Sequence, residues 1–328
     1  MPEQPLVFLS AADVKQALPM REAIEAMEEA FVELSCGRAV VPKRMHLAIP
    51  ELASTALLMP AYAQGYVGLK LVTLCQENPA KGLPLIHALV VLVEAGEGRP
   101  VAVLEGSSLT ALRTGAASGL ATRLLARPEA EVAAIFGAGV QGRTQLEAVC
   151  IVRPIWKAYV VDPDREKART FAAEMTERLS IPVRVASPGE ALAEADVVCT
   201  ATTSTTPAFS DRQLKEGVHI NAIGSYKPHM QEIPEETVCR AKVVVDQREA
   251  CLAEAGDLIV PLKRGLIEPG DIHAELGEIV AGVKEGRTSP EEITLFKSVG
   301  NAIQDLVAAV KVFQAAQRQR LGTNIPPM

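Results

Sequence analysis

The residues with the clearest chemical potential are the glycines of the segment Gly137-Ala138-Gly139-Val140-Gln141-Gly142. An apolar run over 132–136 predicts a strand before this segment, and a helical pattern over 140–152 follows it. In that context the G-x-G-x-x-G spacing is typical of a dinucleotide-binding loop. The first glycine permits a tight turn, the second lets the backbone approach a pyrophosphate, and the third lets the helix pack on the strand. We therefore predict that residues 137–142 hold the phosphates of a dinucleotide at the N-terminus of the helix.

An acidic residue, Asp162, ends the next predicted strand, AYVVD, and lies 25 residues beyond Gly137. In dinucleotide-binding folds an acid about 20 residues after the glycine loop accepts hydrogen bonds from the adenosine ribose. A carboxylate at this place also repels a 2′-phosphate, so the sequence favours NAD as the cofactor and leaves NADP as an alternative. The plainer interpretation is that Asp162 only caps the helix that follows it.

Small polar residues follow two later apolar strands, in the segments TATTS from Thr200 and NAIGS from Asn221. Ligands of open α/β sheets bind at the carboxyl edge of the strands, where these segments would lie. The alternative is that both segments are ordinary loops between strand and helix. We predict cofactor contacts from six of their residues: Ala201, Thr202, Thr203, Ile223, Gly224 and Ser225.

A lysine, Lys70, interrupts the apolar strand pattern YVGLKLVTLC, and alternation places Gly68 and Val72 on its face. An unpaired ammonium on a buried face costs several kcal/mol, roughly, so it needs an anionic partner or a functional role. The competing interpretation is a lysine on an edge strand that reaches solvent.

Two arginines are candidates for binding a carboxylate, because a guanidinium donates two parallel hydrogen bonds to one. Arg113 lies in an Ala-rich helical segment beside Thr114 and Gly115, and Arg44 precedes a predicted strand. Both could equally be solvated surface residues. Met59, in LLMPAY, is an apolar residue whose default place is the core.

The elements that must position these residues fall into two groups. Over roughly the first hundred residues, four strand-like runs and the run PVAVLEG are joined by turn residues, which predicts a mostly antiparallel sheet with a helix on it. A long Ala-rich helix is expected over 108–126. Strands then alternate with helices, which indicates a parallel sheet covered on both faces. The predicted fold class is therefore α/β, a Rossmann doubly wound sheet together with an α+β domain.

The C-terminal region is predicted to be helical. Ser289, Pro290 and Glu292 match a capping box with proline at the first helical position, and the helix should run to Arg320 with a bend near Gly300. The final GTNIPPM is predicted to be a loose tail.

Composition excludes several function classes. The chain has 328 residues, of which 48% are hydrophobic, so two folded domains are expected. Its net charge of −7 argues against nucleic-acid binding. The cysteines and histidines show no metal-ligand spacing, so no metal site is predicted. Scattered cysteines and the lack of a targeting or membrane-spanning segment predict a cytoplasmic protein without membrane association.

Taken together in order, several segments resemble the ornithine cyclodeaminase and mu-crystallin family across nearly the whole chain. They are the PKR segment, LLMPAY, GLKLVTLCQENPAKGLP, LEGSSLTALRTGAASGLA, FGAGVQGRTQ, NAIGSYKPHMQEIP, AGDLIVPL and LFKSVGNAIQDL. The resemblance implies a homodimer whose residues 1–115 and 295–328 form a substrate-binding and dimerisation domain. It also implies that residues 116–294 form the Rossmann domain.

The family's shared theme is a carbon–nitrogen bond beside a carboxylate, oxidised or reduced by a nicotinamide. The resemblance implies that Arg44, Lys70 and Arg113 hold the substrate carboxylate and that Met59 lines the same pocket. It further implies cofactor contacts from Thr114, the glycine loop and Thr202, in addition to Asp162. Lys70 and Arg113 are the expected catalytic residues, with Lys70 a candidate proton donor whose pKa is lowered by burial and neighbouring cations.

The sequence departs from the cyclodeaminase pattern at Ser225, where those enzymes resemble this segment but carry an aspartate. Serine cannot act as a carboxylate base, which puts ornithine cyclisation in doubt. The resemblance therefore favours an NAD(P)-dependent amino acid dehydrogenase or imine reductase, of the ketimine reductase or alanine dehydrogenase type. Two alternatives stay open. One is an ornithine cyclodeaminase that releases ammonia, and the other is a non-catalytic, NAD(P)H-binding protein similar to mu-crystallin.

Overall fold

The computed structural model describes residues 5–326, apart from the side chain of residue 79. They divide into two compact units, one within Met1–Arg113 plus Asn301–Met328 and the other within Thr114–Gly300. Helix α3 (Gly106–Leu125) begins in the first unit and continues in the second. None of the helices formed by the described residues is long and apolar enough to span a membrane.

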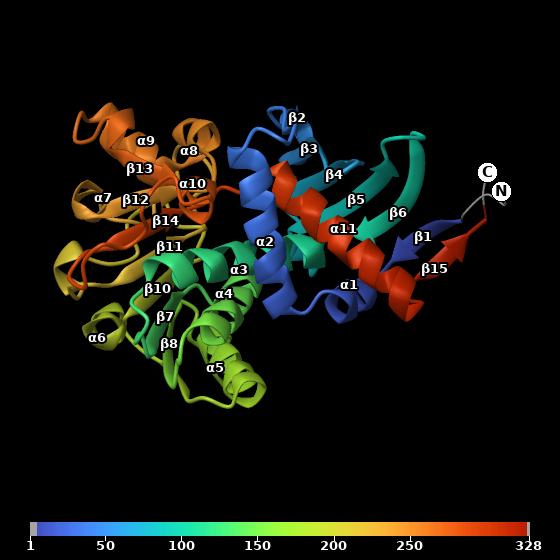
Figure 1. Cartoon of the computed structure of the whole chain (residues 1–328). Coiled ribbons are helices and arrows are strands. Elements are labelled where there is room, and N and C mark those ends of the chain that lie inside the picture. Colours follow the sequence, from blue (N-terminus) through green and yellow to red (C-terminus); the bar gives the residue numbers. More distant parts are fainter. Residues whose placement is uncertain (1–4, 327–328) are drawn as a thin grey trace. The chain divides into compact units, whose positions relative to one another are not determined.

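In the described residues, the first unit contains one seven-stranded sheet with the order β15-β1-β6-β5-β4-β3-β2 (Figure 1). The strands are β1 (Leu6–Leu9), β2 (Met45–Ile49), β3 (Ser54–Ala63), β4 (Tyr66–Cys75), β5 (Ile86–Glu94), β6 (Arg99–Glu105) and β15 (Thr323–Ile325). The run from β2 to β6 is antiparallel, as predicted, and strands that are consecutive in the chain are neighbours in the sheet.

Helices cover one face of this sheet: α1 (Ala11–Ala17), α2 (Met20–Ser35) and α11 (Ala302–Gln319). Helix α11 packs on β3, β4 and β5 and on α2. The approach is close, because a Cβ added to Gly68 of β4 would lie 2.9 Å from Leu306 of α11. A residue on the inner face of β4 therefore meets α11.

The second unit contains an eight-stranded sheet of parallel strands in the described residues, with the order β13-β12-β14-β11-β10-β7-β8-β9. The strands are β7 (Val132–Phe136), β8 (Lys157–Val161), β9 (Val183–Val185), β10 (Val197–Thr200), β11 (His219–Ala222), β12 (Lys242–Val245), β13 (Ile272–Glu275) and β14 (Thr294–Lys297). After β7 the chain forms β8 and β9 on one side of β7, and then β10 on the other side of β7. The switch point between β7 and β10 is where such sheets bind ligands.

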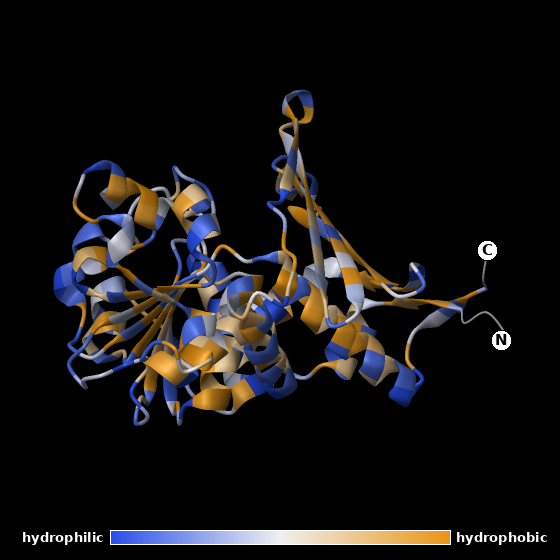
Figure 2. Cartoon of the chain, turned by 45° about the horizontal axis from the view of Figure 1, so that its top comes forward, coloured by the Kyte–Doolittle hydropathy of each residue, from blue (hydrophilic) through white to orange (hydrophobic). Residues whose placement is uncertain are grey.

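The connecting helices are α4 (Val140–Val152), α5 (Arg165–Leu179), α6 (Pro188–Glu194), α7 (Glu235–Arg240), α8 (Arg248–Glu254), α9 (Gly256–Lys263) and α10 (Leu276–Val280). Side chains of β7 alternate between two apolar clusters, one on each face of the sheet. Both faces are therefore buried, which explains why the strands read as continuous apolar runs (Figure 2). The fold is the α/β arrangement predicted from the strand–helix alternation.

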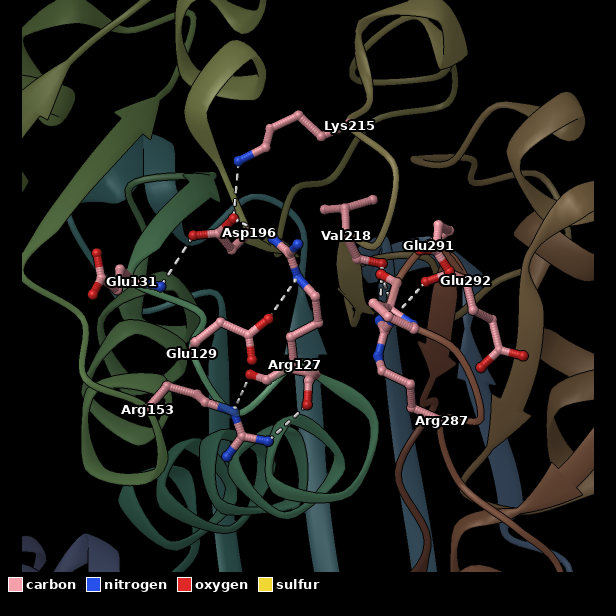
Figure 3. Close-up of polar contacts among 12 residues, drawn as sticks. Arg127, Glu129, Glu131, Arg153, Asp196, Lys215, Val218, Arg287, Glu291 and Glu292 are labelled. Carbon is pink, nitrogen blue, oxygen red and sulfur yellow. Dashed lines mark hydrogen bonds and ion pairs between the residues drawn. The ribbon is translucent and has the colours of Figure 1, made fainter.

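Ion pairs and capping arginines close the amino-terminal edge of the parallel sheet (Figure 3). The Asp196 carboxylate accepts hydrogen bonds from the backbone N–H groups of Glu131 and Val132, at 3.0 and 3.1 Å. It also pairs with Arg127 and Lys215. Arg153 donates to carbonyl groups at the end of α3. These contacts hold the edge opposite to the one where the glycine loop lies.

Two predictions for the C-terminal region were wrong. The segment 289–292 is not a helix start: it forms a turn before strand β14, which pairs with β11 and β12. The helix begins only at Ala302, after Gly300 adopts φ +75° and Asn301 caps it. The predicted loose tail also contains β15, which pairs with β1, although residues 327–328 lie outside the described residues.

Candidate functional site

The predicted cofactor loop has the geometry that its glycines indicated. Gly137 adopts φ +103°, and a Cβ there would lie 2.5 Å from the carbonyl oxygen of Ala201. A Cβ on Gly142 would lie 2.2 Å from the carbonyl oxygen of Gly137, so only glycine allows this packing of α4 on β7. Gly139 faces open space and is the N-cap of α4, with no side chain capping the helix. Free N–H groups at such a helix end suit a phosphate.

Asp162 lies beside this loop, directly after β8. Its carboxylate accepts a hydrogen bond from the backbone N–H of Ala138 at 2.8 Å and another from Asp164 at 2.9 Å. The cap of the following helix α5 is Asp164, so the plainer interpretation of Asp162 as that cap does not hold. Asp162 therefore ends β8 next to the glycine loop, the position at which dinucleotide-binding folds carry a ribose-binding acid.

The two later segments meet the glycine loop at the same edge of the sheet. The N–H of Ala201 donates to the carbonyl of Phe136, and the N–H of Ile223 donates to that of Thr200. Strand ends β7, β10 and β11 thus bring residues 137–142, 201–203 and 223–225 together, as the sequence predicted for a carboxyl edge. Thr114 is also buried in this unit, where its carbonyl accepts from Gln145.

Ser225 was predicted to contact the cofactor, but its side chain is already engaged within the fold. The side chain is fully buried, and its hydroxyl donates to the carbonyl of Met230 at 2.8 Å. The backbone N–H of Ser225 is also used, since it donates to Glu232. Any contact of Ser225 with a ligand would therefore be limited to its carbonyl group.

The basic candidates of the first unit surround an acidic residue that sequence reasoning missed, Asp305 of α11. Lys70 Nζ lies 2.6 Å from one oxygen of this carboxylate, and Arg113 Nε lies 2.9 Å from the other. Arg113 also donates to the side-chain carbonyl of Gln304 at 2.8 Å. Lys70 and Arg113 are 3% and 5% exposed, so neither is the solvated residue of the alternative interpretation.

Burial and charge act in opposite directions on this group. Burial lowers the pKa of Lys70 to about 8, although the charge of Asp305 raises it, and the nearby cations Arg113 and Arg44 lower it further. For Asp305 burial alone would raise the pKa, but Arg113 and Lys70 outweigh it and hold the pKa below its usual value. Lys70 can therefore exchange a proton near neutral pH, while Asp305 stays ionised.

Met59 and Arg44 lie beside the ion group of Lys70, Arg113 and Asp305. Met59 is buried and lies directly opposite Lys70 in the β3–β4 register, on the same face of the sheet. Arg44 precedes β2 and is half-buried, and its charge reaches Lys70. The arrangement therefore combines three cations, one anion and an apolar wall, which suits a small carboxylate.

The signal for Asp305 was present in the sequence. Its neighbours along the helix include the apolar residues Ala302 and Leu306, so Asp305 is a carboxylate within a largely apolar segment. A buried carboxylate requires a cationic partner, and Lys70 was an equally unexplained buried cation. The sequence thus offered two charges in apolar segments, and the fold shows that they meet.

Comparisons with known proteins cover nearly the whole chain. The model of the ornithine cyclodeaminase/mu-crystallin family matches residues 5–320. A Delta(1)-pyrroline-2-carboxylate reductase from Bacillus cereus is 44% identical over 324 residues, which are 98% of this chain and 99% of that protein.

Two solved structures are similar in both sequence and fold. Delta(1)-pyrroline-2-carboxylate reductase from Thermococcus litoralis, in complex with NADH and L-proline, is 44% identical with a TM-score of 0.94, over 98% of this chain and 100% of that chain. An archaeal alanine dehydrogenase dimer with bound NAD is 38% identical with a TM-score of 0.92, over 98% of each chain.

Proposed function

The chain belongs to the ornithine cyclodeaminase/mu-crystallin family, and from this premise we propose that it is an NAD-dependent reductase of a small cyclic imino acid. The observation that carries the proposal is the buried ion group of Lys70, Arg113 and Asp305. The relatives named for this activity act on a carbon–nitrogen bond next to a carboxylate. In this chain we assign substrate binding to the first unit and dinucleotide binding to the second.

The ion group supports a substrate with one carboxylate. Asp305 offsets only one of the two positive charges of Lys70 and Arg113, so a positive charge stays unmatched inside the unit. A buried charge without a partner is costly, and a substrate carboxylate would supply the partner. The side-chain nitrogen of Gln304 is buried without a hydrogen-bond partner among the described residues and offers a further donor.

The geometry of the glycine loop supports the binding of a dinucleotide. The open space at Gly139, the uncapped N-terminus of α4 and the position of Asp162 suit a pyrophosphate and a ribose. We propose that residues 137–142, Thr114, Asp162, 201–203 and 223–225 contact NAD, with NADP disfavoured by the charge of Asp162. When bound, the nicotinamide supplies the hydride for the α-carbon of the imine.

The residues of the first unit would position the substrate and supply a proton. Arg113, together with Arg44, would bind the carboxylate, and such positioning contributes roughly 7–11 kcal/mol to lowering a barrier. Lys70, whose pKa is lowered to about 8, would donate the proton that the substrate nitrogen needs. Asp305 would hold Lys70 and Arg113 in place and would not itself exchange a proton.

We also propose that the protein is a homodimer through the uncovered face of the first unit's sheet. This outward face carries exposed apolar side chains on neighbouring strands: Met45, Leu47, Tyr62, Val67, Leu69, Leu71 and Leu89. A contiguous apolar face of this kind marks an interaction surface. The similar alanine dehydrogenase is a dimer, so a second copy of this chain is the proposed occupant.

The scattered cysteines suit a cytoplasmic location.

The test is NADH oxidation by the purified protein at neutral pH, with pyrroline-2-carboxylate, piperideine-2-carboxylate, and pyruvate with ammonium offered separately. We expect turnover with a cyclic ketimine and a preference for NADH over NADPH. Turnover with pyruvate and ammonium alone would instead make the protein an alanine dehydrogenase, the activity of the 38% identical relative.

Two other results would overturn the proposal. Ammonia release from ornithine without net NADH consumption would indicate a cyclodeaminase. NADH binding without turnover of any imine would indicate a non-catalytic binding protein. If the protein does reduce an imine, Arg113→Met tests the role of Arg113. The variant removes the guanidinium, so it should raise the KM for the imine and leave NADH affinity unchanged.

A further inference from the structure

One carboxylate, Glu232, joins the two loops that follow β10 and β11. One of its oxygens accepts hydrogen bonds from the Thr200 hydroxyl at 3.0 Å and from the N–H groups of Gly224 and Ser225 at 2.6 and 3.1 Å. The other oxygen accepts from the N–H of Thr202 at 2.6 Å. Glu232 is fully buried, so these contacts replace its hydration.

The two loops are in close contact at this point. A Cβ on Gly224 would lie 2.2 Å from the carbonyl oxygen of Thr202 and 2.5 Å from the carboxylate of Glu232. No side chain larger than hydrogen fits there without displacing backbone. The position of each loop is therefore set by the other loop and by Glu232.

Glu232 is itself held in place by a second buried carboxylate. Asp257, at the start of α9, accepts from the N–H groups of Glu232 and Ile233 at 2.7 and 3.0 Å. The other oxygen of Asp257 pairs with Lys297 at the end of β14, at 3.0 Å. Burial, and then the charge of Asp257, raise the pKa of Glu232, while Lys297 and the Thr202 contact oppose the rise.

We propose that Glu232 is a positioning residue for the cofactor, which fixes the loops 201–203 and 223–225 in the arrangement that binds the dinucleotide. The inference rests on the proposed function, because it takes these loops as the cofactor's contacts. The side chain of Glu232 would not touch the cofactor, because both of its oxygens bind the two loops from the buried side.

The test variant is Glu232→Gln, which keeps the size and removes the charge. Both oxygens of Glu232 accept from N–H groups, so the amide NH₂ must face at least one N–H donor in either orientation. A buried donor without a partner is costly, and we expect the loops to shift. The expected result is a rise of about tenfold or more in the dissociation constant for NADH, measured by nicotinamide fluorescence.

The chain offers a matched control in Asp196→Asn. Asp196 is also a buried carboxylate that accepts from two backbone N–H groups, but at the opposite edge of the same sheet (Figure 3). It should cost stability without changing NADH affinity. In steady-state assays Glu232→Gln should raise the KM for NADH and leave the KM for the imine unchanged, a separation that general destabilisation does not produce.

Should Glu232→Gln fail to fold, Thr200→Val removes one donor to the same carboxylate, and Thr237→Val is its control, since Thr237 donates to Asp211 elsewhere in the unit. Thr200→Val alone should then weaken NADH binding. Equal NADH affinity in wild type and Glu232→Gln, or an equal loss in Asp196→Asn, overturns this inference while the proposed function stands. A wild-type protein that binds no NADH overturns both.

Discussion

The ammonium of Lys70 lies 2.6 Å from the carboxylate of Asp305, and both side chains are buried. Lys70 is on the inner face of β4, and Asp305 is on the helix α11 that covers this face. The pair joins two segments that are far apart in the sequence, and Arg113 completes it from α3. Burial lowers the pKa of Lys70 to about 8, and the charge of Asp305 opposes a further fall, so this pair sets the pH at which Lys70 exchanges its proton.

The pH profile of imine reduction should reflect the ionisation of Lys70. The lowered pKa of Lys70, about 8, means that the lysine is protonated below this pH and neutral above it. Imine reduction needs the protonated form, so kcat/KM should be constant below about pH 8 and fall above it. Oxidation of the amino acid product needs the neutral form and should rise with pH to a plateau above the same value.

Lys70→Arg is the control for this profile. A guanidinium stays protonated at these pH values, so the fall in imine reduction assigned to Lys70 should vanish while the overall rate drops by about 10²–10⁴-fold. The substrate's own titration is common to both proteins and cancels in the comparison. Identical pH profiles for wild type and variant would exclude Lys70 as the proton donor.

Asp305→Asn should move the same profile to lower pH. The charge of Asp305 raises the pKa of Lys70, so its removal should lower that pKa, and imine reduction should begin to fall at a lower pH than in wild type. The variant also leaves two buried cations without their anion, which costs roughly 3–5 kcal/mol of unfolding free energy. Kinetic pH profiles and urea denaturation measure the two effects.

Glu29→Gln is the matched control for Asp305→Asn. Glu29 of α2 pairs at 2.7 Å with Lys311, which lies on α11 as Asp305 does, but this pair is exposed. Its loss should cost at most about 1 kcal/mol and leave the pH profile unchanged. An unchanged profile in Asp305→Asn as well would show that Asp305 does not govern Lys70.

Asp162 should decide between the two dinucleotides. Asp162→Ala removes the carboxylate beside the N–H of Ala138, so NADH should lose about tenfold in kcat/KM while NADPH gains relative to it. Asp164→Ala is the control, because Asp164 caps α5 two residues later. It should cost about 1 kcal/mol in stability and keep the cofactor ratio. A ratio that changes equally in both variants would count against a ribose contact of Asp162.

The uncovered sheet face should determine the oligomeric state. Leu69→Lys places a charge in the middle of the exposed apolar side of β4, and we expect it to convert a dimer to a monomer in sedimentation experiments. Leu266→Lys changes an exposed leucine of the second unit and should leave the dimer intact. Wild-type protein that sediments as a monomer would contradict the proposed interface.

The second unit was largely predictable from the sequence because its signals are local. The strand and helix around the glycine loop follow from an apolar run, three glycines and the helical pattern, and α4 spans the predicted residues 140–152. Gly137 and Gly142 are required by backbone contacts that their motif already implied. Lys70 was identifiable because a charge on an apolar strand face needs an explanation.

The remaining features depend on contacts between distant segments. The capping pattern at Ser289 resembled a helix start, but pairing with β11 and β12 makes the next apolar residues a strand. The short β15 has no pattern of its own and forms only because β1 lies beside it. Asp305 and Glu232 were missed for the same reason: their roles lie in partners far along the chain.

The most direct test of the central claim is isotope transfer. The protein would be incubated with pyrroline-2-carboxylate and NADH deuterated at C4, each C4 epimer in turn, and the proline formed would be analysed by NMR. We predict one deuteron at the α-carbon of proline with one of the two epimers, in step with NADH consumption. Proline that carries no deuterium at this carbon with either epimer, or no consumption of NADH, would contradict the account.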